Sequence, residues 1–567
     1  MMKQDKLKKI AIASGVLSSA AITGLAFHHI HKKNKARAMA QKISKTQQIY
    51  LIGGGFAALA AATYFIEDGH IDGKNIHIID SGDDLGGSSL AFGNKYCGYA
   101  CFKESYLFKD CAENCYDLFT RIPSLEWKGK SLAEELENYN RLHPTIAQAR
   151  MIDRYGAILN VDSMKLNPKD FLNLIKLMMT SDGSLDDVSI ETWFQDCPHF
   201  YKTNFWCLWQ STFGMVKTSS ALQFKRYLKR MIADIPNLAT LQGLIQTRYH
   251  SYESIIVPMK SYLDGCGVQF HHGMEVKDVY FKEDELTVTD LRVVECGYEK
   301  IIHLNLHDLC LLTSGSGLNQ AQFGDYHHVP KAYDATVGGA LWKKLADQKA
   351  VLGNPSVFFN QEDKTTTESF TITTKKDTFV RLIEKLSGNL PGTGGLITFK
   401  ESNWLLSIMV PSQPHFKDQD HSMNVIWGSG LNTEAIGNYV HKKMKDCTGE
   451  EILCELLHHL HFEKDKDAIL QSIVNVIVCV MPYGQASFAT CALSDRPRVV
   501  PSGSTNFAIV SPFVELMDDV VFTEEYNVRA ARHAVASLLH IKSSVIPAKK
   551  RYYQLKNYLR MMKTLMK

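Results

Sequence analysis

A glycine-rich turn near the start of the sequence has the residue types that bind a phosphate group. Gly53, Gly55 and Ala58 stand at the spacing GxGxxA. In such a turn the first glycine permits a tight bend, the second lets the backbone approach a pyrophosphate, and the small third residue lets a helix pack on a strand. The N-terminus of that helix also favours negative charge. The pattern therefore predicts a dinucleotide site.

The segments around the turn are those that such a site requires. Residues 48–53 form an apolar, β-branched run that is typical of a buried parallel strand, and a helix-forming run follows the turn. A second strand is expected over residues 75–79, and it ends at Asp80, where an acidic partner for a ribose hydroxyl is expected. This context favours a nucleotide site over a glycine-rich turn that only packs.

Two later segments favour FAD over NAD as the nucleotide. Val276 closes a strand-like run, and the apolar strand expected over residues 308–315 ends in the small residues Ser314 and Gly315. Because these pieces lie far downstream of the turn, they are typical of the discontinuous nucleotide domain of two-dinucleotide-binding flavoproteins. We therefore expect Val276, Ser314 and Gly315 to contact the cofactor.

Four cysteines form a local cluster with a possible chemistry of its own. Cys97 and Cys101, then Cys111 and Cys115, are two pairs at i, i+4 spacing, and on helices each pair would share a face. The cluster could be a metal site or two disulfides, since the spacing of zinc ligands varies. We favour buried or half-exposed thiols in a helical region, because thirteen cysteines spread over 567 residues indicate free thiols in a reducing compartment.

Composition excludes several classes of protein. A hydrophobic content of 45% and a charged content of 22% are those of a globular protein, and 567 residues suggest two to four domains. The net charge of +3 is nearly balanced, and the basic residues gather at the ends of the chain. We therefore expect no nucleic-acid partner.

The N-terminal segment is expected to be a membrane anchor. Residues 10–27 are uncharged but rich in Ala, Ser and Gly, and as a helix they would reach about 27 Å, barely enough to cross a bilayer. Lysines flank both sides, more heavily on the C-terminal side, which favours a body that faces the cytoplasm. A cleaved signal peptide and a soluble helix are the alternatives.

The C-terminal segment, residues 549–567, alternates Lys and Arg with Tyr, Leu and Met at roughly helical spacing. Such a basic amphipathic helix can lie on an anionic membrane surface. It can equally be a terminal helix that packs one face on the body. The sequence does not decide between the two.

The chain resembles the oleate hydratases, also called myosin-cross-reactive antigens, from about residue 49 to residue 539. The resemblance is carried by NFWCLWQSTF with KRYL, PGTGGLITFKESNWLLSIMV with QPHF, GNYVHKKMKDCTGEEILCELLHHL, and DRPRVVPSGSTNFAIVSPFVELMDDVVFTEEYNVRAARHAV. The last of these stretches is long and specific.

This resemblance implies a fold and an activity. It implies an α/β fold like that of the flavin amine oxidases, with a Rossmann-type FAD domain, an inserted mixed-sheet substrate domain and a helical part. It also implies an FAD-dependent enzyme that adds water across the cis double bond of an unsaturated fatty acid, with a carboxylate that activates water and a tyrosine that protonates the alkene. Homodimers that associate with membranes are common in the family.

On this basis the chain divides into seven stretches. We expect an anchor and linker over residues 1–45, a first part of the FAD domain over 46–160, a helical substrate-lining region over 161–250, a second part of the FAD domain over 251–330, a substrate domain over 331–470, a final part of the FAD domain over 471–545, and a basic amphipathic helix over 546–567.

The match is poorest at the expected active site. Gly86 and Gly87 match the family's GGS step beside the flavin, but the position of the family's catalytic glutamate falls on Tyr106 or Leu107. Neither residue is a carboxylate, so Glu104 is our candidate in its place, with a solvated surface acid as the alternative.

Two other side chains keep the family's residue type. Tyr227 in KRYL matches the catalytic tyrosine, and His415 in QPHF is retained as a contact to the substrate carboxylate. The family's other polar contacts to that carboxylate fall on Met409 and Pro411, whose side chains cannot bind it.

Three hypotheses follow. The first is an active fatty-acid hydratase with a shifted carboxylate. The second is a diverged, membrane-tethered relative that binds flavin or lipid without hydration. The third is a flavoprotein in which the four clustered cysteines carry thiol or metal chemistry.

Overall fold

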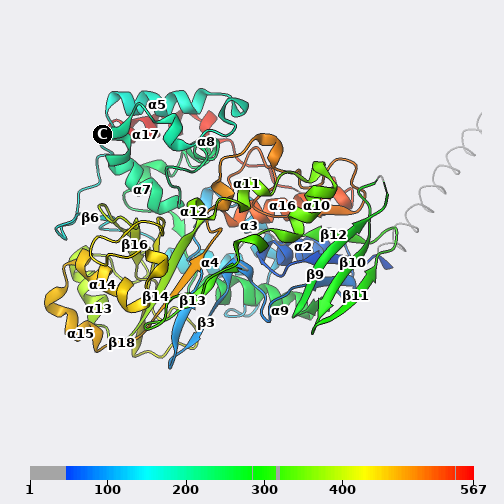
Figure 1. Cartoon of the computed structure of the whole chain (residues 1–567), viewed down its shortest axis with the longest axis horizontal. Helices are drawn as coiled ribbons and strands as arrows, with labels where there is room; N and C mark the ends of the chain where they lie inside the picture. The colour runs from blue at the N-terminus through cyan, green and yellow to red at the C-terminus, as the bar shows by residue number, and fades with distance from the viewer. Residues whose placement is uncertain (1–45, 284, 314–319, 543–544) are drawn as a thin grey trace, which may run out of the picture.

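The computed structural model describes residues 46–283, 285–313, 320–542 and 545–567. Three sequence predictions fall outside these ranges: the anchor segment of residues 10–27, Ser314 and Gly315. Figure 1 shows three regions, with the first strands and helices on one side, the large sheet with its covering helices on another, and α5, α7, α8 and α17 together at one end.

The first region is a parallel sheet that begins at the glycine-rich turn. Strand β1 (Ile49–Ile52) pairs in parallel with β2 (Ile76–Ile79), and helix α2 (Phe56–Glu67) connects them. The sheet order is β19-β12-β1-β2-β8. The other strands are β8 (Gln269–His271), β12 (Leu309–Leu312) and β19 (Phe507–Ile509). The predicted strand–turn–helix–strand unit is confirmed, and β12 and β19 join it from far downstream.

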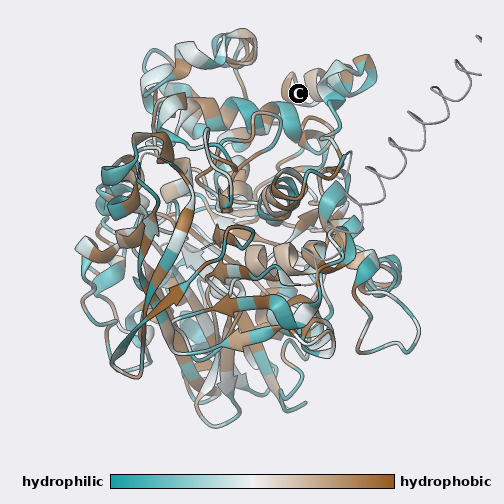
Figure 2. Cartoon of the chain, turned by 90° about the vertical axis from the view of Figure 1, so that its right-hand side faces the viewer, coloured by the Kyte–Doolittle hydropathy of each residue, from teal (hydrophilic) through white to brown (hydrophobic). Residues whose placement is uncertain are grey.

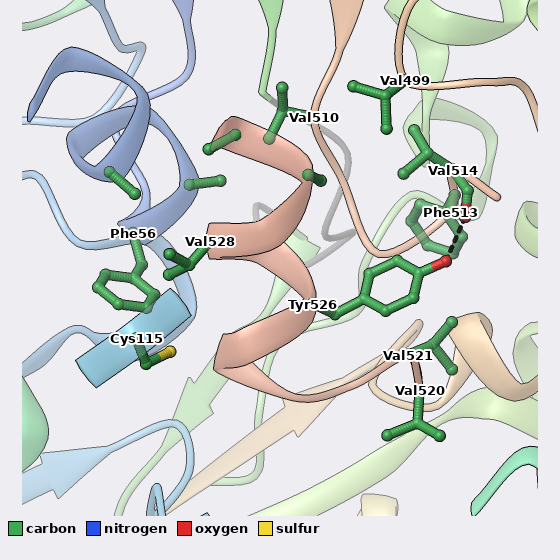
Figure 3. Close-up of a cluster of buried hydrophobic side chains, with 14 of the residues drawn as sticks. Phe56, Cys115, Val499, Val510, Phe513, Val514, Val520, Val521, Tyr526 and Val528 are labelled. Carbon is green, nitrogen blue, oxygen red and sulfur yellow. Dashed lines mark hydrogen bonds between the residues drawn. The ribbon is translucent and has the colours of Figure 1, made fainter. Parts of the chain in front are cut away.

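Helix α2 is buried from Phe56 to Phe65, because α16 (Glu524–Leu538) packs along it. The alanines of α2 allow this close approach. Figure 3 shows Phe56 and Val528 on the two helices beside Cys115, and Tyr526 at the start of α16, where its hydroxyl donates to the backbone oxygen of Val514. The turn is therefore fixed between a sheet and a second helix.

The second region is a mixed seven-stranded sheet in the order β13-β18-β14-β17-β16-β15-β6. Most of its pairs are antiparallel, and β15 pairs with β6 in parallel. Its strands are β6 (Met151–Ile152), β13 (Gln322–Gly324), β14 (Thr367–Lys375), β15 (Ile397–Phe399), β16 (Leu406–Met409), β17 (Met423–Gly430) and β18 (Ile473–Met481).

The two faces of this sheet have different partners. Phe370 and Ile372 of β14 pack in a core with α13 (Thr378–Ser387) and α14 (Gly449–Leu460). The intervening Ser369 points the other way, where its hydroxyl donates to the backbone oxygen of Cys101. The alternation of β14 side chains thus separates a helix-covered face from one that faces the nucleotide region. Figure 2 shows hydrophobic residues concentrated on strands in the interior of the molecule and hydrophilic residues on many of its outer loops.

The third region is helical. Helix α17 (Leu555–Leu565) packs on the 3-10 turn at Ile235–Asn237. Helices α7 (Asn204–Phe213) and α8 (Ala221–Arg230) are buried along most of their length. Rings of Phe200, Phe205 and Trp209 pack against one another beside these helices.

The remaining helices are distributed over the whole molecule. They are α3 (Glu113–Arg121), α4 (Leu132–Leu142), α5 (Pro168–Met179), α6 (Ile190–Trp193), α9 (Val257–Gly265), α10 (Ala340–Gln348), α11 (Ser356–Phe359), α12 (Glu362–Thr365) and α15 (Lys466–Leu470).

Three small sheets complete the fold. An antiparallel sheet is formed by β9 (Met274–Phe281), β10 (Val288–Glu295) and β11 (Tyr298–His303). Strands β3 (Ala91–Asn94) and β4 (Gly98–Cys101) form a hairpin, and β5 (Leu107–Phe108) pairs with the distant β7 (Leu244–Ile245). Among the described residues, no helix is both long and apolar enough to span a bilayer. The domain boundaries given above stay predictions.

Candidate active site

A cavity of about 300 Å³ lies where the three regions meet. One end is lined by the glycine-rich turn through Gly55, Phe56 and Ala57, and its middle by the loop that joins β4 to β5. Helices α7 and α8 and the inner face of the mixed sheet line the rest. Segments from almost the whole chain therefore converge on one cavity.

The nucleotide end is built from backbone. Gly55 is the N-cap of α2 and provides no side-chain cap, so the first N–H groups of the helix face the cavity, where a phosphate would bind. Gly53 has φ of 109°, and its N–H donates to Ile79 over 2.8 Å. Ala58 is fully buried. Gly53, Gly55 and Ala58 thus take the positions that the fingerprint predicts.

Gly86 and Gly87 close over the same turn. The N–H of Gly86 donates to the oxygen of Gly54, and a Cβ on Gly87 would stand 3.2 Å from the Cα of Gly55. Gly86 and Gly87 have φ of 136° and 54°, which side chains disfavour. Two glycine turns therefore come together and leave room for a ligand along their backbones.

Asp80 and Val276 lie behind this end of the cavity. The Asp80 carboxylate accepts the N–H of Gly54 and, over 2.8 Å, that of Gly82, so it stabilises the turn itself. Val276 is buried within β9, where it pairs with Val293. Neither residue lines the described cavity, and their contact with a cofactor stays a prediction.

Polar atoms along the cavity fit a bound group. Both amide atoms of Gln485 and the hydroxyls of Ser487 and Ser105 are buried and have no hydrogen-bond partner among the described residues. An unpaired buried polar group is costly, so these atoms suit a ligand with many oxygens and nitrogens. Together with the glycine cradle, they fit a dinucleotide.

Glu104 occupies the middle of the cavity wall, between β4 and β5. Its Oε1 atom lies 2.7 Å from Nε2 of His415 and 3.6 Å from Sγ of Cys101. Burial by itself would raise the pKa of Glu104, but the His415 ring outweighs it and holds this pKa below its usual range. Glu104 is therefore a buried, charged carboxylate, and the alternative of a solvated surface acid is wrong.

His415 is brought to Glu104 but does not line the described cavity. The ring of His250 lies against it and closes the cluster. Nδ1 of His250 accepts the N–H of Tyr252, and Nε2 lies 3.1 Å from the oxygen of Lys103. Burial lowers the pKa of His250 to about 4, so its ring is neutral.

Ligand atoms of Cys101, Glu104 and His250 lie within 4.8 Å of one another. However, both ring nitrogens of His250 are used by backbone groups, and burial raises the pKa of the Cys101 thiol. The arrangement is that of a hydrogen-bonded cluster and offers no free nitrogen of His250 to a metal ion.

Tyr227 projects from α8 into the cavity wall. Its hydroxyl donates to the backbone oxygen of Val521, and the rings of Phe213 and Phe488 lie 5.2 and 5.8 Å away. Burial raises the pKa of Tyr227 well above its usual value, so it keeps its proton. Tyr227 is fully buried and lines the cavity. A tyrosine that only packs on the inner face of an amphipathic helix would also be buried, so the catalytic role of Tyr227 stays a prediction.

The four-cysteine cluster does not form as the spacing suggested. Cys97 is exposed in a turn, Cys101 ends β4, Cys111 lies in a 3-10 turn and only Cys115 lies in an α-helix. All four are free thiols. The i, i+4 spacing predicted shared helical faces, but a strand and a loop separate these residues instead.

Several residues at the cavity were not predicted to contribute their own side chains to the site. Tyr106, Thr212 and Trp427 join the cavity from a loop, a helix and the mixed sheet, and Arg150 lies behind them. Arg150 offered one hint, since it is a charge between apolar residues, but its partners lie far away in the sequence.

Similar folds define the class of protein. The structure aligns with a putative protoporphyrinogen oxidase from Exiguobacterium (TM-score 0.51, 13% identity, 88% of this chain and 99% of the other). It also aligns with cyclohexylamine oxidase from Brevibacterium oxydans (TM-score 0.51, 11% identity, 87% and 99%). The predicted flavin amine oxidase-like α/β fold is confirmed.

The sequence defines the family within that class. The MCRA family model matches residues 46–536. The chain is 34% identical to the oleate hydratase of Streptococcus pyogenes over 504 residues (87% of this chain, 85% of the other). It is 35% identical to the linoleate hydratase of Lactiplantibacillus plantarum over 524 residues (85% and 92%). The chain belongs to the MCRA family.

Proposed function

We propose that this protein is an FAD-dependent fatty-acid hydratase, a hydro-lyase that adds water to the cis double bond of an unsaturated fatty acid. The observation that carries the proposal is the 34–35% identity to an oleate and a linoleate hydratase over most of both chains. The cavity adds chemical support, because it places a charged carboxylate and a protonated tyrosine along one wall.

Hydration needs an acid and a base beside the same bond. We assign Glu104 as the base: its carboxylate orients a water molecule and accepts a proton from it as the oxygen bonds to carbon. Tyr227 is the acid and gives its phenolic proton to the other carbon of the double bond. Proton transfer from Glu104 back to Tyr227, through solvent, restores both groups and balances the reaction.

His415 has a supporting role in this scheme. Its Nε2 atom lies 2.7 Å from Oε1 of Glu104, so it fixes the orientation of the carboxylate and keeps it charged. This replaces the role that the resemblance implied, direct contact with the substrate carboxylate. The second oxygen of Glu104 is then left to meet water.

FAD would be held by the backbone of Gly55 and Gly87, which line the cavity beside the bend at Gly53, and by polar groups such as Gln485 and Ser487. When bound, it would shape and polarise the active site without a net exchange of electrons. Absorption spectra of the purified protein, with and without added FAD, test this assignment.

The activity test is direct. Full-length protein would be incubated with oleate or linoleate plus FAD, and the lipid extract examined by mass spectrometry. We expect a hydroxy fatty acid that is heavier than the substrate by one water. No such product from either acid, with FAD bound, would reject hydration of these substrates.

A second candidate is a relative that binds flavin and lipid without hydration. It is favoured by one observation: neither Tyr106 nor Leu107, which match the position of the family's catalytic glutamate, is a carboxylate. Saturable binding of oleate without product would support it. The thiol or metal candidate has lost its basis in the structure, because the four cysteines are dispersed.

We also propose a peripheral membrane contact through α17. Met561 and Leu565 pack on the body, whereas Leu555 and Leu559 are 69% and 57% exposed beside the lysines of the same helix. Sedimentation with anionic vesicles, compared with neutral ones, tests this contact. We further propose that the protein is a homodimer, as the resemblance implies. The molar mass of the purified protein, measured by light scattering, tests this proposal.

A further inference from the structure

One end of the cavity is apolar. Leu241, Leu244, Leu396 and Met409 form a small core there, and the rings of Tyr106, Phe108 and Trp427 pack against it. Met409 and Trp427 are directly opposite on β16 and β17. A hydrocarbon chain would make favourable apolar contacts here, but a polar head group would need specific hydrogen-bond partners.

Arg150 lies buried directly behind this apolar end. Its guanidinium donates to the backbone oxygens of Leu396 and Leu238 and, over 3.0 Å, to the hydroxyl oxygen of Thr212. No described carboxylate forms an ion pair with it. Burial lowers the pKa of Arg150 to about 9, so it remains charged at neutral pH.

A fully buried charge without a counter-charge destabilises the folded protein, because the charge loses its hydration. Backbone oxygens and one hydroxyl satisfy the N–H groups of Arg150 but provide no negative charge. The positive field therefore extends into the adjoining cavity, whose walls at this point are apolar and weaken it little.

Three uncharged hydrogen-bond donors lie at the cavity surface near Arg150. The hydroxyl oxygen of Thr212 accepts from Arg150, so its hydrogen is free to point into the cavity, and no described acceptor takes it. The Nε1–H group of Trp427 is buried and has no described partner. The hydroxyl of Tyr106 meets only the sulfur of Met409, a weak acceptor.

We propose that Thr212, Trp427 and Tyr106 form the anchor for the substrate's carboxylate, and that Arg150 is a positioning residue that supplies the positive charge behind them. This inference rests on the proposed function and names the recognition element for its substrate class. It assigns the head group to the apolar end of the cavity, away from His415, which is held by Glu104.

The set of partners selects an anion. All three groups donate hydrogen bonds at this point, and a carboxylate has only acceptors to offer. A fatty alcohol or a methyl ester could accept one or two of the same bonds but would leave the charge of Arg150 unbalanced. The carboxylate of an unsaturated fatty acid is therefore bound more tightly than either neutral analogue.

The test compares oleate with methyl oleate on the FAD-loaded full-length protein. Binding would be measured by calorimetry in a detergent below its micelle concentration, and hydration by mass spectrometry where it occurs. Thr212→Val removes one donor, together with an acceptor of Arg150, and keeps the shape of the side chain, whereas Trp427→Phe removes one donor and leaves a smaller ring. For each variant we expect KM and Kd for oleate to rise about 10-fold, as the loss of one hydrogen bond to a charged group predicts, with kcat retained.

Two controls separate an anchor from a merely structural role. Ser211→Ala removes the neighbouring hydroxyl of α7, which already donates to backbone oxygens of its own helix, and should change nothing. Methyl oleate should lose less affinity than oleate in the Thr212 and Trp427 variants, because its ester oxygens accept only hydrogen bonds between neutral groups there. Arg150→Met is informative only if its circular dichroism spectrum matches that of the unaltered protein, and then oleate binding should fall further than in either donor variant.

Each outcome decides the inference. Oleate binding that weakens in both donor variants by more than methyl oleate binding does supports it even if no product forms, in which case only the proposed hydration fails. Equal weakening for both lipids, or none, overturns it while hydration stands. Failure of the unaltered protein to prefer oleate over methyl oleate, or to bind oleate at all, also overturns it.

Discussion

The two ends of the cavity are built from different parts of the polypeptide. The nucleotide end consists of backbone N–H groups and glycine Cα atoms from two turns that are close in the sequence, around Gly55 and Gly87. The rest of the cavity, from Glu104 in the middle of the wall to the apolar end, is called the chemical end. It depends on side chains from distant segments, such as Glu104 with His415 and Arg150 with Thr212. The first kind of site is carried by local chain geometry, and the second depends on long-range packing.

This difference explains why the glycine motif is complete whereas the position of the family's catalytic carboxylate is not matched. A backbone cradle needs glycines at fixed spacing, so its sequence cannot drift without loss of the site. A carboxylate can be supplied from more than one nearby position, because a side chain can reach the same point from a different Cα. Glu104 occupies the cavity wall although Tyr106 and Leu107 fill the matching positions.

The largest effect is expected at the chemical end, from Glu104→Gln. Loss of the base should reduce kcat on the order of 1,000-fold, within the range for general-base catalysis. Flavin binding should stay unchanged, since the nucleotide end is separate. Initial rates of hydroxy-acid formation and a flavin absorbance titration measure the two effects. A variant that retains most of its activity would show that another group is the base.

Tyr227→Phe should lower kcat on the order of 100-fold, because the phenolic proton is lost while the ring packing with Phe213 remains. Tyr526→Phe is the matched control. Tyr526 is also fully buried and donates to a backbone oxygen, but it does not line the cavity (Figure 3). Both variants should lose similar thermal stability, about 1 kcal/mol, and only the first should lose activity. Equal activities would remove Tyr227 from the chemistry.

At the nucleotide end, Gly87→Ala should weaken the binding of FAD and leave the chemical step intact. The added Cβ would stand 3.2 Å from the Cα of Gly55, at a φ of 54° that side chains disfavour. We expect FAD affinity to fall about 10-fold, with kcat recovered at saturating FAD. Gly183→Ala is the control, since a Cβ there meets nothing within 4 Å. Unchanged FAD affinity would contradict the placement of the cofactor along these glycines.

The smallest effect is a shift in the pH profile of the His415→Gln variant. In the unaltered protein, His415 holds the pKa of Glu104 below the ordinary value of 4.5. Glu104 therefore stays charged, and can act as the base, until the pH falls below that pKa. Without His415, burial dominates and raises that pKa. The acidic limb of kcat/KM should therefore move to higher pH. An unmoved limb would show that another group controls it.

The local elements could be predicted from the sequence because their signals are local. The apolar run of residues 48–53 and the GxGxxA turn predicted β1 and α2, and the periodicity of residues 549–567 predicted a C-terminal helix. The same local reasoning failed for the cysteines: regular spacing at 97, 101, 111 and 115 indicates a shared face only if the backbone is helical, and most of that stretch is not.

The sequence alone determined the nucleotide fingerprint, the fold class and the family, because each depends on residue type at fixed spacing along the chain. Only the tertiary structure decided what surrounds Glu104 and which charges are balanced. It brings His415 to Glu104 from 311 positions away and leaves Arg150 buried beside the apolar end of the cavity without a carboxylate partner among the described residues. The physical reason is that electrostatic pairing depends on distance in space, which a spacing pattern in the sequence does not contain.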